Sequence, residues 1–149
     1  MAEDIRRFRI NDSDSLVLPA KRDAFVNLQS WLNQIADELA LADKTRKHLL
    51  IVADEIFTNI ANYGYPFGDG TAEVPVDFNM ATSEIVITFS DNGIAYNPLQ
   101  VPPPDFDSPL ADREIGGLGV FVVKKLMDSV EYERREDRNV LILKKIITN

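Results

Sequence analysis

Three polar side chains share one face of a predicted helix in the first half of the chain. Glu55, Asn59 and Asn62 stand at positions i, i+4 and i+7, so a helix aligns them in one stripe. The stripe offers a carboxylate and two carboxamides, and polar groups beside apolar side chains need partners. Apolar residues accompany it on the same helix: Val52, Ala53, Ile56 and Ile60. The alternative is that the stripe simply faces water, as the polar side of many helices does.

A carboxylate stands at the end of an apolar strand. The segment 84–90 (EIVITFS) is followed directly by Asp91, Asn92 and Gly93. A carboxylate there can accept a hydrogen bond from an exocyclic amine, and glycine lets a ligand approach the backbone closely. An ordinary Asp-Asn-Gly turn is the competing interpretation.

A glycine-rich segment, residues 116–119 (GGLG), opens the third predicted helix. The unpaired N–H groups and the positive end of the helix dipole at such a start can bind phosphate. The segment is not a Walker A loop, because neither Gly-Lys-Ser nor Gly-Lys-Thr follows. It is also not a GxGxxG motif after a strand of a βαβ unit. The alternative is a hinge between a loop and a helix.

The elements that must position these groups follow from hydrophobic periodicity and turn residues. Antiparallel hairpins with three helices, without βαβ alternation, predict the α+β class. We expect a two-layer sandwich in which the helices cover one face of a mixed, mostly antiparallel sheet. The predicted strands are residues 8–11, 15–18, 72–80, 84–90, 129–134 and 139–147. The predicted helices are residues 20–41, 43–63 and the segment that follows residues 116–119.

Local signals refine these elements. Asp43 is the expected N-cap of the second helix, which Gly64 and Pro66 end. Pro75 suggests an edge strand, whereas residues 84–90 are typical of a buried central strand. The apolar stripe of the first helix comprises Phe25, Leu28, Leu32, Ile35 and Leu39, with Trp31 on the same packing face. The inward positions of the third helix are Val120, Val123, Leu126 and Met127.

Length and composition indicate one globular domain over residues 1–149. Apolar residues make up 45% and charged residues 27%, close to ordinary globular usage. The formal charge of -8 and the absence of a long basic run argue against general nucleic-acid binding. The absence of cysteine and the single His48 exclude thiolate and multi-histidine metal sites. Neither a membrane span nor the apolar core of a signal peptide is recognisable, so we expect a cytoplasmic protein.

Residues 97–114 form a compositionally biased segment with five of the eight prolines. We expect this segment to be a long loop. Arg113 near its end is interpreted as a solvated side chain, with a phosphate or a partner chain as alternative contacts. Lys124 and Lys125 are assigned to the solvated face of the third helix.

Taken in order, these motifs resemble a known family. The sequence contains a helix with E-x-x-x-N, a strand that ends in D-x-G-x-x-Y, a Pro-rich segment and a G-G-L-G helix start. This pattern resembles the N, G1 and G2 boxes of the Bergerat-fold (GHKL) ATPases. The segments EIFTNIANYGY and GGLGVFVVKKLMD resemble the anti-sigma-factor serine kinases of the RsbW and SpoIIAB type. The resemblance spans nearly the whole chain and implies the histidine-kinase-like ATPase fold.

The resemblance assigns roles on the second helix. It implies that Asn59 binds the Mg²⁺ ion that bridges the phosphates of ATP, in keeping with the preference of Mg²⁺ for oxygen ligands. Glu55 is implied as the general base that takes a proton from an attacking serine or water. Asn62 is expected to line the same pocket. Tyr63 departs from the family, in which many kinases have a histidine, and we expect its phenol to pack. A role inferred for that histidine is therefore in doubt here.

The resemblance also assigns the ends of the nucleotide. Asp91 is implied to accept a hydrogen bond from the adenine amino group, and Gly93 to leave space for the base. The segment 97–115 is implied to be the ATP lid. The phosphate-binding segment comprises Gly117, Leu118 and Gly119, through their backbone N–H groups, with Val120 beside them in the cofactor-binding set.

The implied function is that of an ATP-dependent protein serine/threonine kinase and anti-sigma factor. Its substrate is expected to be an anti-anti-sigma factor with a STAS domain, and in a second complex it is expected to bind a sigma factor. A homodimer rests on the analogy alone. The alternative is a regulatory clamp that binds adenine nucleotide without significant phosphoryl transfer. A detached catalytic domain of a histidine kinase ranks last, because His48 lies early in the second helix.

Overall fold

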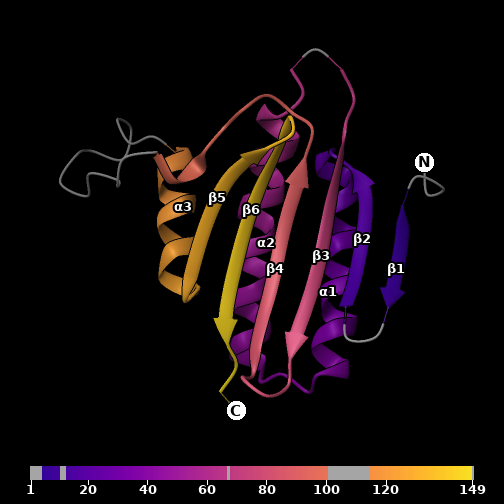
Figure 1. Ribbon diagram of the computed structural model, residues 1–149, viewed down its shortest axis with the longest axis vertical. Coiled ribbons are helices and arrows are strands. Elements are labelled where there is room, and N and C mark those ends of the chain that lie inside the picture. The colour runs from indigo at the N-terminus through magenta and orange to yellow at the C-terminus, as the bar shows by residue number, and fades with distance from the viewer. Residues whose placement is uncertain (1–4, 11–12, 67, 101–114, 149) are drawn as a thin grey trace.

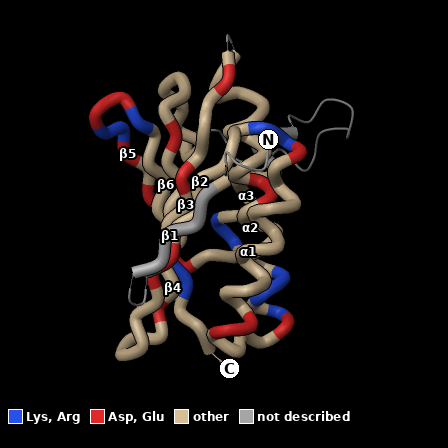
Figure 2. The backbone as a smooth tube through the Cα atoms, turned by 90° about the vertical axis from the view of Figure 1, so that its right-hand side faces the viewer, with Lys and Arg blue, Asp and Glu red and all other residues tan. Residues whose placement is uncertain are grey.

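The computed structural model describes residues 5–10, 13–66, 68–100 and 115–148, and these form two layers. Six strands form one sheet in the order β1-β2-β3-β4-β6-β5, and every pairing is antiparallel. The three α-helices lie together on one face of the sheet (Figures 1 and 2). The strands are β1 Arg6–Ile10, β2 Ser13–Pro19, β3 Thr71–Asn79, β4 Glu84–Asp91, β5 Ser129–Arg135 and β6 Arg138–Ile146. The helices are α1 Phe25–Glu38, α2 Asp43–Tyr63 and α3 Ile115–Leu126, with short 3₁₀ turns η2 Arg22–Ala24 and η3 Pro98–Gln100. The expected α+β sandwich is confirmed.

The core lies between the sheet and the helices. β4 occupies a central position, as expected from its apolar sequence, and its alternate side chains Ile85, Ile87 and Phe89 are buried under the helices. β6 pairs with β4 so that Leu143 lies opposite Ile87 and Leu141 opposite Phe89. Burial of this alternating apolar face is the main force that holds the two layers together.

The first helix is shorter than expected. In place of a helix over residues 20–41, the chain forms η2 and then α1, which ends at Glu38. Ala40 follows with a φ of 52°, a left-handed conformation that stops the helix. Trp31 packs in the core as expected, and its indole N–H donates to the buried carboxylate of Asp14 at 3.2 Å.

Asp43 is not the N-cap of the second helix. It is the first residue of α2, and Ala42 precedes it in an extended conformation without a side-chain cap. An aspartate in the first turn still interacts favourably with the helix dipole, which explains why this residue type occurs there. α2 ends at Tyr63 with Gly64 as C-cap, as predicted.

The expectation that Pro75 marks an edge strand is wrong. β3 lies inside the sheet, between β2 and β4. β3 pairs with β4 at Ala72 and Glu73 and again from Val76 onward, so Pro75 is not paired with β4. A proline is tolerated inside this sheet because its missing N–H falls in that gap.

The hairpin between β5 and β6 is tight. The turn residues Glu136 and Asp137 have φ values of 50° and 63°, as required for the two-residue turns that connect antiparallel strands. The turn is therefore shorter than the four residues, 135–138, that the predicted strands leave between them. The end of this hairpin, the end of β4, the last turns of α2 and the start of α3 all lie at the same end of the molecule (Figure 1).

Candidate functional site

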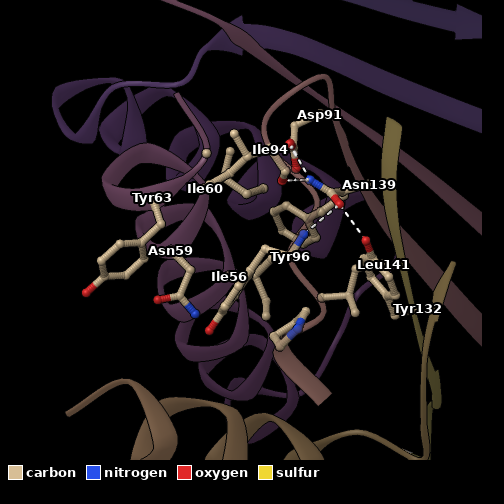
Figure 3. A pocket seen from close by; sticks show the side chains of 13 residues that line it. Ile56, Asn59, Ile60, Tyr63, Asp91, Ile94, Tyr96, Tyr132, Asn139 and Leu141 are labelled. Carbon is tan, nitrogen blue, oxygen red and sulfur yellow. Dashed lines mark hydrogen bonds between the residues drawn. The ribbon is translucent and has the colours of Figure 1, made fainter. Parts of the chain in front are cut away.

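A pocket opens where these elements meet (Figure 3). α2 and the central strands supply an apolar lining, while polar groups lie at its ends. The residues that line it are Ile56, Asn59, Ile60, Tyr63, Gly64, Phe89, Asp91, Ile94, Tyr96, Pro98, Tyr132, Asn139 and Leu141.

Asp91 has one carboxylate oxygen engaged with protein and one available. The residue is only 4% exposed at the end of β4. Its Oδ1 accepts hydrogen bonds from the Gly93 N–H at 2.9 Å and from Asn139 Nδ2 at 3.0 Å. Its Oδ2 accepts no hydrogen bond from any residue in the described ranges. Asp91 Oδ2 is not enclosed by protein, so Asp91 is suited to accept a hydrogen bond from an N–H group of a ligand in the pocket.

Gly93 is required by the protein itself. A Cβ at this position would overlap the carbonyl oxygen of Gly64 and come within 2.9 Å of Asp91 Oδ1. The next residue, Ile94, donates its N–H to the same Gly64 carbonyl at 2.9 Å. The turn after β4 therefore rests directly on the C-terminal end of α2, and this contact fixes the distance between Asp91 and the polar face of the helix.

Two arginines hold this turn from the β5–β6 hairpin. Arg134 Nη1 donates to the Gly93 carbonyl at 3.0 Å. Arg138 donates through Nε to Ser90 Oγ at 2.9 Å and through Nη1 to Asn92 Oδ1. The backbone around Asp91 is thus held in place before any ligand arrives, which lowers the entropic cost of binding.

Asn139 is a pocket residue that the sequence analysis missed. It is 7% exposed, and it connects Asp91 to the segment after the turn and to Tyr132. It lies directly opposite Asp91 in the register of β4 and β6. Only the register could have identified it, because a single asparagine after a charged turn has no distinctive pattern in the sequence.

Asn59 and Tyr63 extend from α2 on the side of the pocket away from Asp91 (Figure 3). The Asn59 carboxamide makes no hydrogen bond with a residue that the structure describes, so its oxygen is available as a ligand. The Tyr63 side chain is 53% exposed at the rim. The expectation that its phenol packs is therefore wrong, because the last turn of α2 faces the mouth of the pocket rather than the core. Asn62 is exposed and is not among the lining residues.

Glu55 lies one turn before Asn59 and against α3. The Glu55 carboxylate packs on the Cα of Gly119, where a Cβ would overlap Oε2 and approach Cδ to 2.9 Å. Partial burial, and in second place the neighbouring Asp54 carboxylate, raise the pKa of Glu55 above its usual value. A raised pKa brings a carboxylate closer to the range in which it can accept and release protons near neutral pH.

The glycine-rich segment lies within a helix. α3 begins at Ile115, so the first four N–H groups, including those of Gly117 and Leu118, have no partner within the helix. The expected turn before the helix is thus part of its first turn. Gly119 follows these four residues, and Val120 is buried, as its inward position predicts, and does not line the pocket.

The predicted lid lies mostly outside the described residues. Residues 101–114, including Arg113, are not part of the description. At the start of the segment, Asn97 Oδ1 accepts the Leu99 N–H at 2.9 Å, and η3 follows. Pro98 of η3 lines the pocket, so the beginning of the segment forms one of its walls.

The described ranges contain neither a cluster of metal-binding side chains nor a membrane-spanning helix. No group of three or more His, Asp or Glu side chains there could hold a metal ion without other ligands. No helix in that same part of the chain is long and apolar enough to span a membrane.

Comparison with known proteins gives consistent matches over most of the chain. The histidine kinase-like ATPase domain family matches residues 18–145. The serine/threonine-protein kinase BtrW of Bordetella bronchiseptica is 28% identical over 131 residues, which cover 88% of this chain and 92% of that protein. The serine-protein kinase RsbW of Bacillus mycoides is 25% identical over 133 residues, which cover 87% of this chain and 82% of that protein. RsbW of Bacillus thuringiensis is 24% identical over the same length and coverage.

Proposed function

The chain belongs to the histidine kinase-like ATPase domain family, and from this premise we propose that it is an ATP-dependent serine/threonine-protein kinase. The observation that supports the proposal is the arrangement of two polar groups that line one pocket and of a third on the helix that forms its wall. Asp91 lies at one end with an available oxygen, Asn59 faces it from α2, and Glu55 lies one helical turn before Asn59. Asp91 is suited to base recognition, Asn59 to metal binding and Glu55 to proton transfer.

The purine end of ATP fits the Asp91 side of the pocket. Asp91 Oδ2 is an acceptor for the exocyclic amine of adenine, which guanine lacks at that position. The apolar walls from Ile56, Ile60 and Phe89 provide surface for the flat ring. The donor set is therefore suited to adenine in particular.

The phosphate end fits the side of Asn59 and α3. Mg²⁺ is commonly held by one or two protein oxygens together with substrate phosphates, so a single carboxamide oxygen from Asn59 is sufficient when nucleotide is present. The free N–H groups at the start of α3 are suited to bind the phosphates. Bound Mg²⁺·ATP would supply the phosphoryl group that is transferred.

Glu55 is proposed as the general base. Its task is to take the proton from the hydroxyl group of the protein substrate as that oxygen attacks phosphorus. The contact with Gly119 holds the carboxylate beside the phosphate-binding end of α3. The raised pKa of Glu55 is consistent with this task, because it makes the carboxylate a better proton acceptor.

The protein substrate is proposed to be an anti-anti-sigma factor with a STAS domain. This proposal extends the relationship to proteins named serine-protein kinase RsbW and serine/threonine-protein kinase BtrW, together with the motifs of the anti-sigma-factor kinases. Binding of a sigma factor in an alternative complex belongs to the same proposal. A clamp that binds nucleotide without transfer remains the competing function, and Glu55 is the residue that favours the kinase.

A transfer assay decides between kinase and clamp. The purified chain is incubated with Mg²⁺, γ-labelled ATP and STAS-domain proteins of the same genome. We expect label on one of these proteins, and we expect Glu55→Gln to abolish the transfer while ATP binding is retained. Asp54→Asn is the matched control, because it removes the same charge one residue away and should retain transfer at pH 8. If the chain binds ATP but none of these STAS-domain proteins becomes labelled, the result would favour the clamp.

A further inference from the structure

One buried carboxamide occupies the centre of the polar end of the pocket. Asn139 makes four hydrogen bonds, to Asp91, Ile94 and Tyr96 at and after the end of β4 and to Tyr132 of β5. We propose that Asn139 is the positioning residue that directs the carboxylate of Asp91 at the nucleotide base and couples it to the first residues of the segment beyond the turn. This inference rests on the proposed adenine-nucleotide site.

The two N–H groups of Asn139 act on the turn after β4. Nδ2 donates to Asp91 Oδ1 at 3.0 Å and to the Ile94 carbonyl at 2.8 Å. Together with the Gly93 N–H, the first of these bonds holds Oδ1 inside the protein. The carboxylate can then rotate little, and Oδ2 is the oxygen that remains for the ligand.

The orientation of the carboxamide is determined by its partners. Asn139 Oδ1 accepts from the Tyr96 N–H at 3.2 Å and from the Tyr132 hydroxyl at 2.5 Å. The Tyr96 N–H can only donate, and the Ile94 carbonyl can only accept, so exchange of oxygen and nitrogen would break both bonds. All four hydrogen-bonding positions of the side chain are used, and none is left for direct contact with a ligand.

This arrangement couples two parts of the pocket. Asp91 recognises the base, whereas Tyr96 belongs to the wall that leads toward the predicted lid. Asn139 is the described side chain that bonds to both (Figure 3). Loss of the carboxamide should therefore impair recognition of the adenine amine specifically, beyond any general loss of stability.

The first test measures discrimination between two nucleotides by calorimetric titration. One is ATP, and the other is purine riboside triphosphate, which lacks the 6-amino group that Asp91 is proposed to bind. The wild-type chain should prefer ATP by about 10- to 100-fold, as expected for a hydrogen bond to a buried charge. Asn139→Leu should reduce this preference to within about 3-fold, mainly through weaker ATP binding.

The second test uses Asn139→Asp and does not depend on the leucine variant being folded. This change places two carboxyl oxygens about 3 Å apart, so the pair should share one proton and its charge should depend on pH. ATP affinity relative to the wild type should therefore rise by about 10-fold or more as pH falls from 8 to 6, since the shared proton restores a hydrogen-bond donor.

The groups around this pair do not account for such a pH dependence. The charged and titratable neighbours in the described ranges are Tyr65, Tyr96, Tyr132, Arg134, Arg138 and Glu73, which forms an ion pair with Arg138 at 3.8 Å and is present in both proteins. Burial raises the pKa values of Tyr65 and Tyr96 above the usual value for tyrosine, further from this pH range. An inflection between pH 6 and 8 in the ratio of variant to wild type therefore belongs to the carboxyl pair.

A carboxamide far from the pocket provides the matched control. Asn79→Ala removes a carboxamide that accepts two backbone N–H groups at the β3–β4 turn, at the other end of the sheet, and should leave nucleotide preference unchanged. If both Asn139 variants keep the wild-type preference for ATP without a new pH dependence, Asn139 is not a positioning residue. If the wild-type chain itself binds no ATP, the proposed function fails as well.

Discussion

At the scale of single residues, the site depends on how a few polar groups divide their bonding capacity. Asp91 uses Oδ1 for the protein and leaves Oδ2 for the pocket. Its position after an apolar strand indicated a candidate hydrogen-bond acceptor, with an ordinary turn as the alternative, and its proposed role in adenine recognition came from the resemblance to the GHKL ATPases. Asn139 could not be predicted, since its role arises from its position opposite Asp91 in the sheet.

Replacement of Asp91 by asparagine should weaken ATP binding. The variant retains an oxygen that can accept from the Gly93 N–H, but it offers an N–H group where the adenine amine requires an acceptor. We expect a loss of about 1–3 kcal/mol in binding free energy, as for a hydrogen bond to a charged group. Titration of ATP by calorimetry provides the measurement, and an unchanged affinity would mean that the base lies elsewhere.

The pKa of Glu55 predicts the acid limb of the transfer reaction. Burial raises the pKa of Glu55, and a general base must be deprotonated to act. As the pH is lowered, the rate of transfer should therefore begin to fall at a higher pH than it would with an exposed carboxylate. Asp54 contributes to the shift, so Asp54→Asn should move the acid limb to lower pH. The rate of transfer, measured from pH 5 to 8 for the wild type and for Asp54→Asn, gives the acid limb of each protein. An acid limb that moves to higher pH in the variant would contradict the assignment of Glu55 as the base.

At the scale of elements, the contact between α2 and α3 places Glu55 beside Gly119, near the helix start that is proposed to bind the phosphates. The helical face with Glu55 and Asn59 was predictable from spacing alone, because helix geometry determines which residues align. The contact of Glu55 with Gly119 was not, since it depends on how two helices distant in sequence pack on one sheet. The predictions of the ends of the first helix and of an edge strand at Pro75 were wrong for the same reason. In both cases tertiary packing and strand pairing outweigh local sequence preference.

Gly119→Ala tests this contact directly. The added methyl group would displace the flexible end of Glu55 while the backbone N–H of residue 119 remains. We expect transfer to fall by about 10- to 100-fold, as for a displaced catalytic group, with ATP affinity changed by less than about 3-fold. The control is Gly68→Ala, because no atom lies within 4 Å of a Cβ placed there. Equal activity of the two variants would show that the packing of Glu55 on Gly119 is not needed for transfer.

At the scale of the whole molecule, the sheet brings distant parts of the chain together at one pocket. Alternating apolar residues and helical periodicity predicted the two layers, because each element must bury one face. The strand order, which places β6 between β4 and β5, follows from long-range pairing that local patterns do not specify. Pocket residues accordingly come from α2, β4, β5, β6 and the segment after β4.

Nucleotide binding should stabilise the whole domain. The pocket connects the helical layer to the sheet, so a ligand that binds only the folded chain shifts the unfolding equilibrium. With ATP at 100 times its dissociation constant, the gain is about 2.7 kcal/mol, or roughly 5–10 °C in Tm for a domain of this size. Thermal unfolding with Mg²⁺ and increasing ATP provides the measurement. A Tm that does not depend on ATP concentration would contradict the proposed site.

The central claim is that one pocket holds adenine at Asp91 and the metal-bound phosphates at Asn59. A crystal structure with Mg²⁺ and a non-hydrolysable ATP analogue tests it most directly. The account predicts the adenine amine about 2.8–3.1 Å from Asp91 Oδ2, with Mg²⁺ bound to the carboxamide oxygen of Asn59. A nucleotide bound with its base near Asn59, or in a different part of the molecule, would contradict the account.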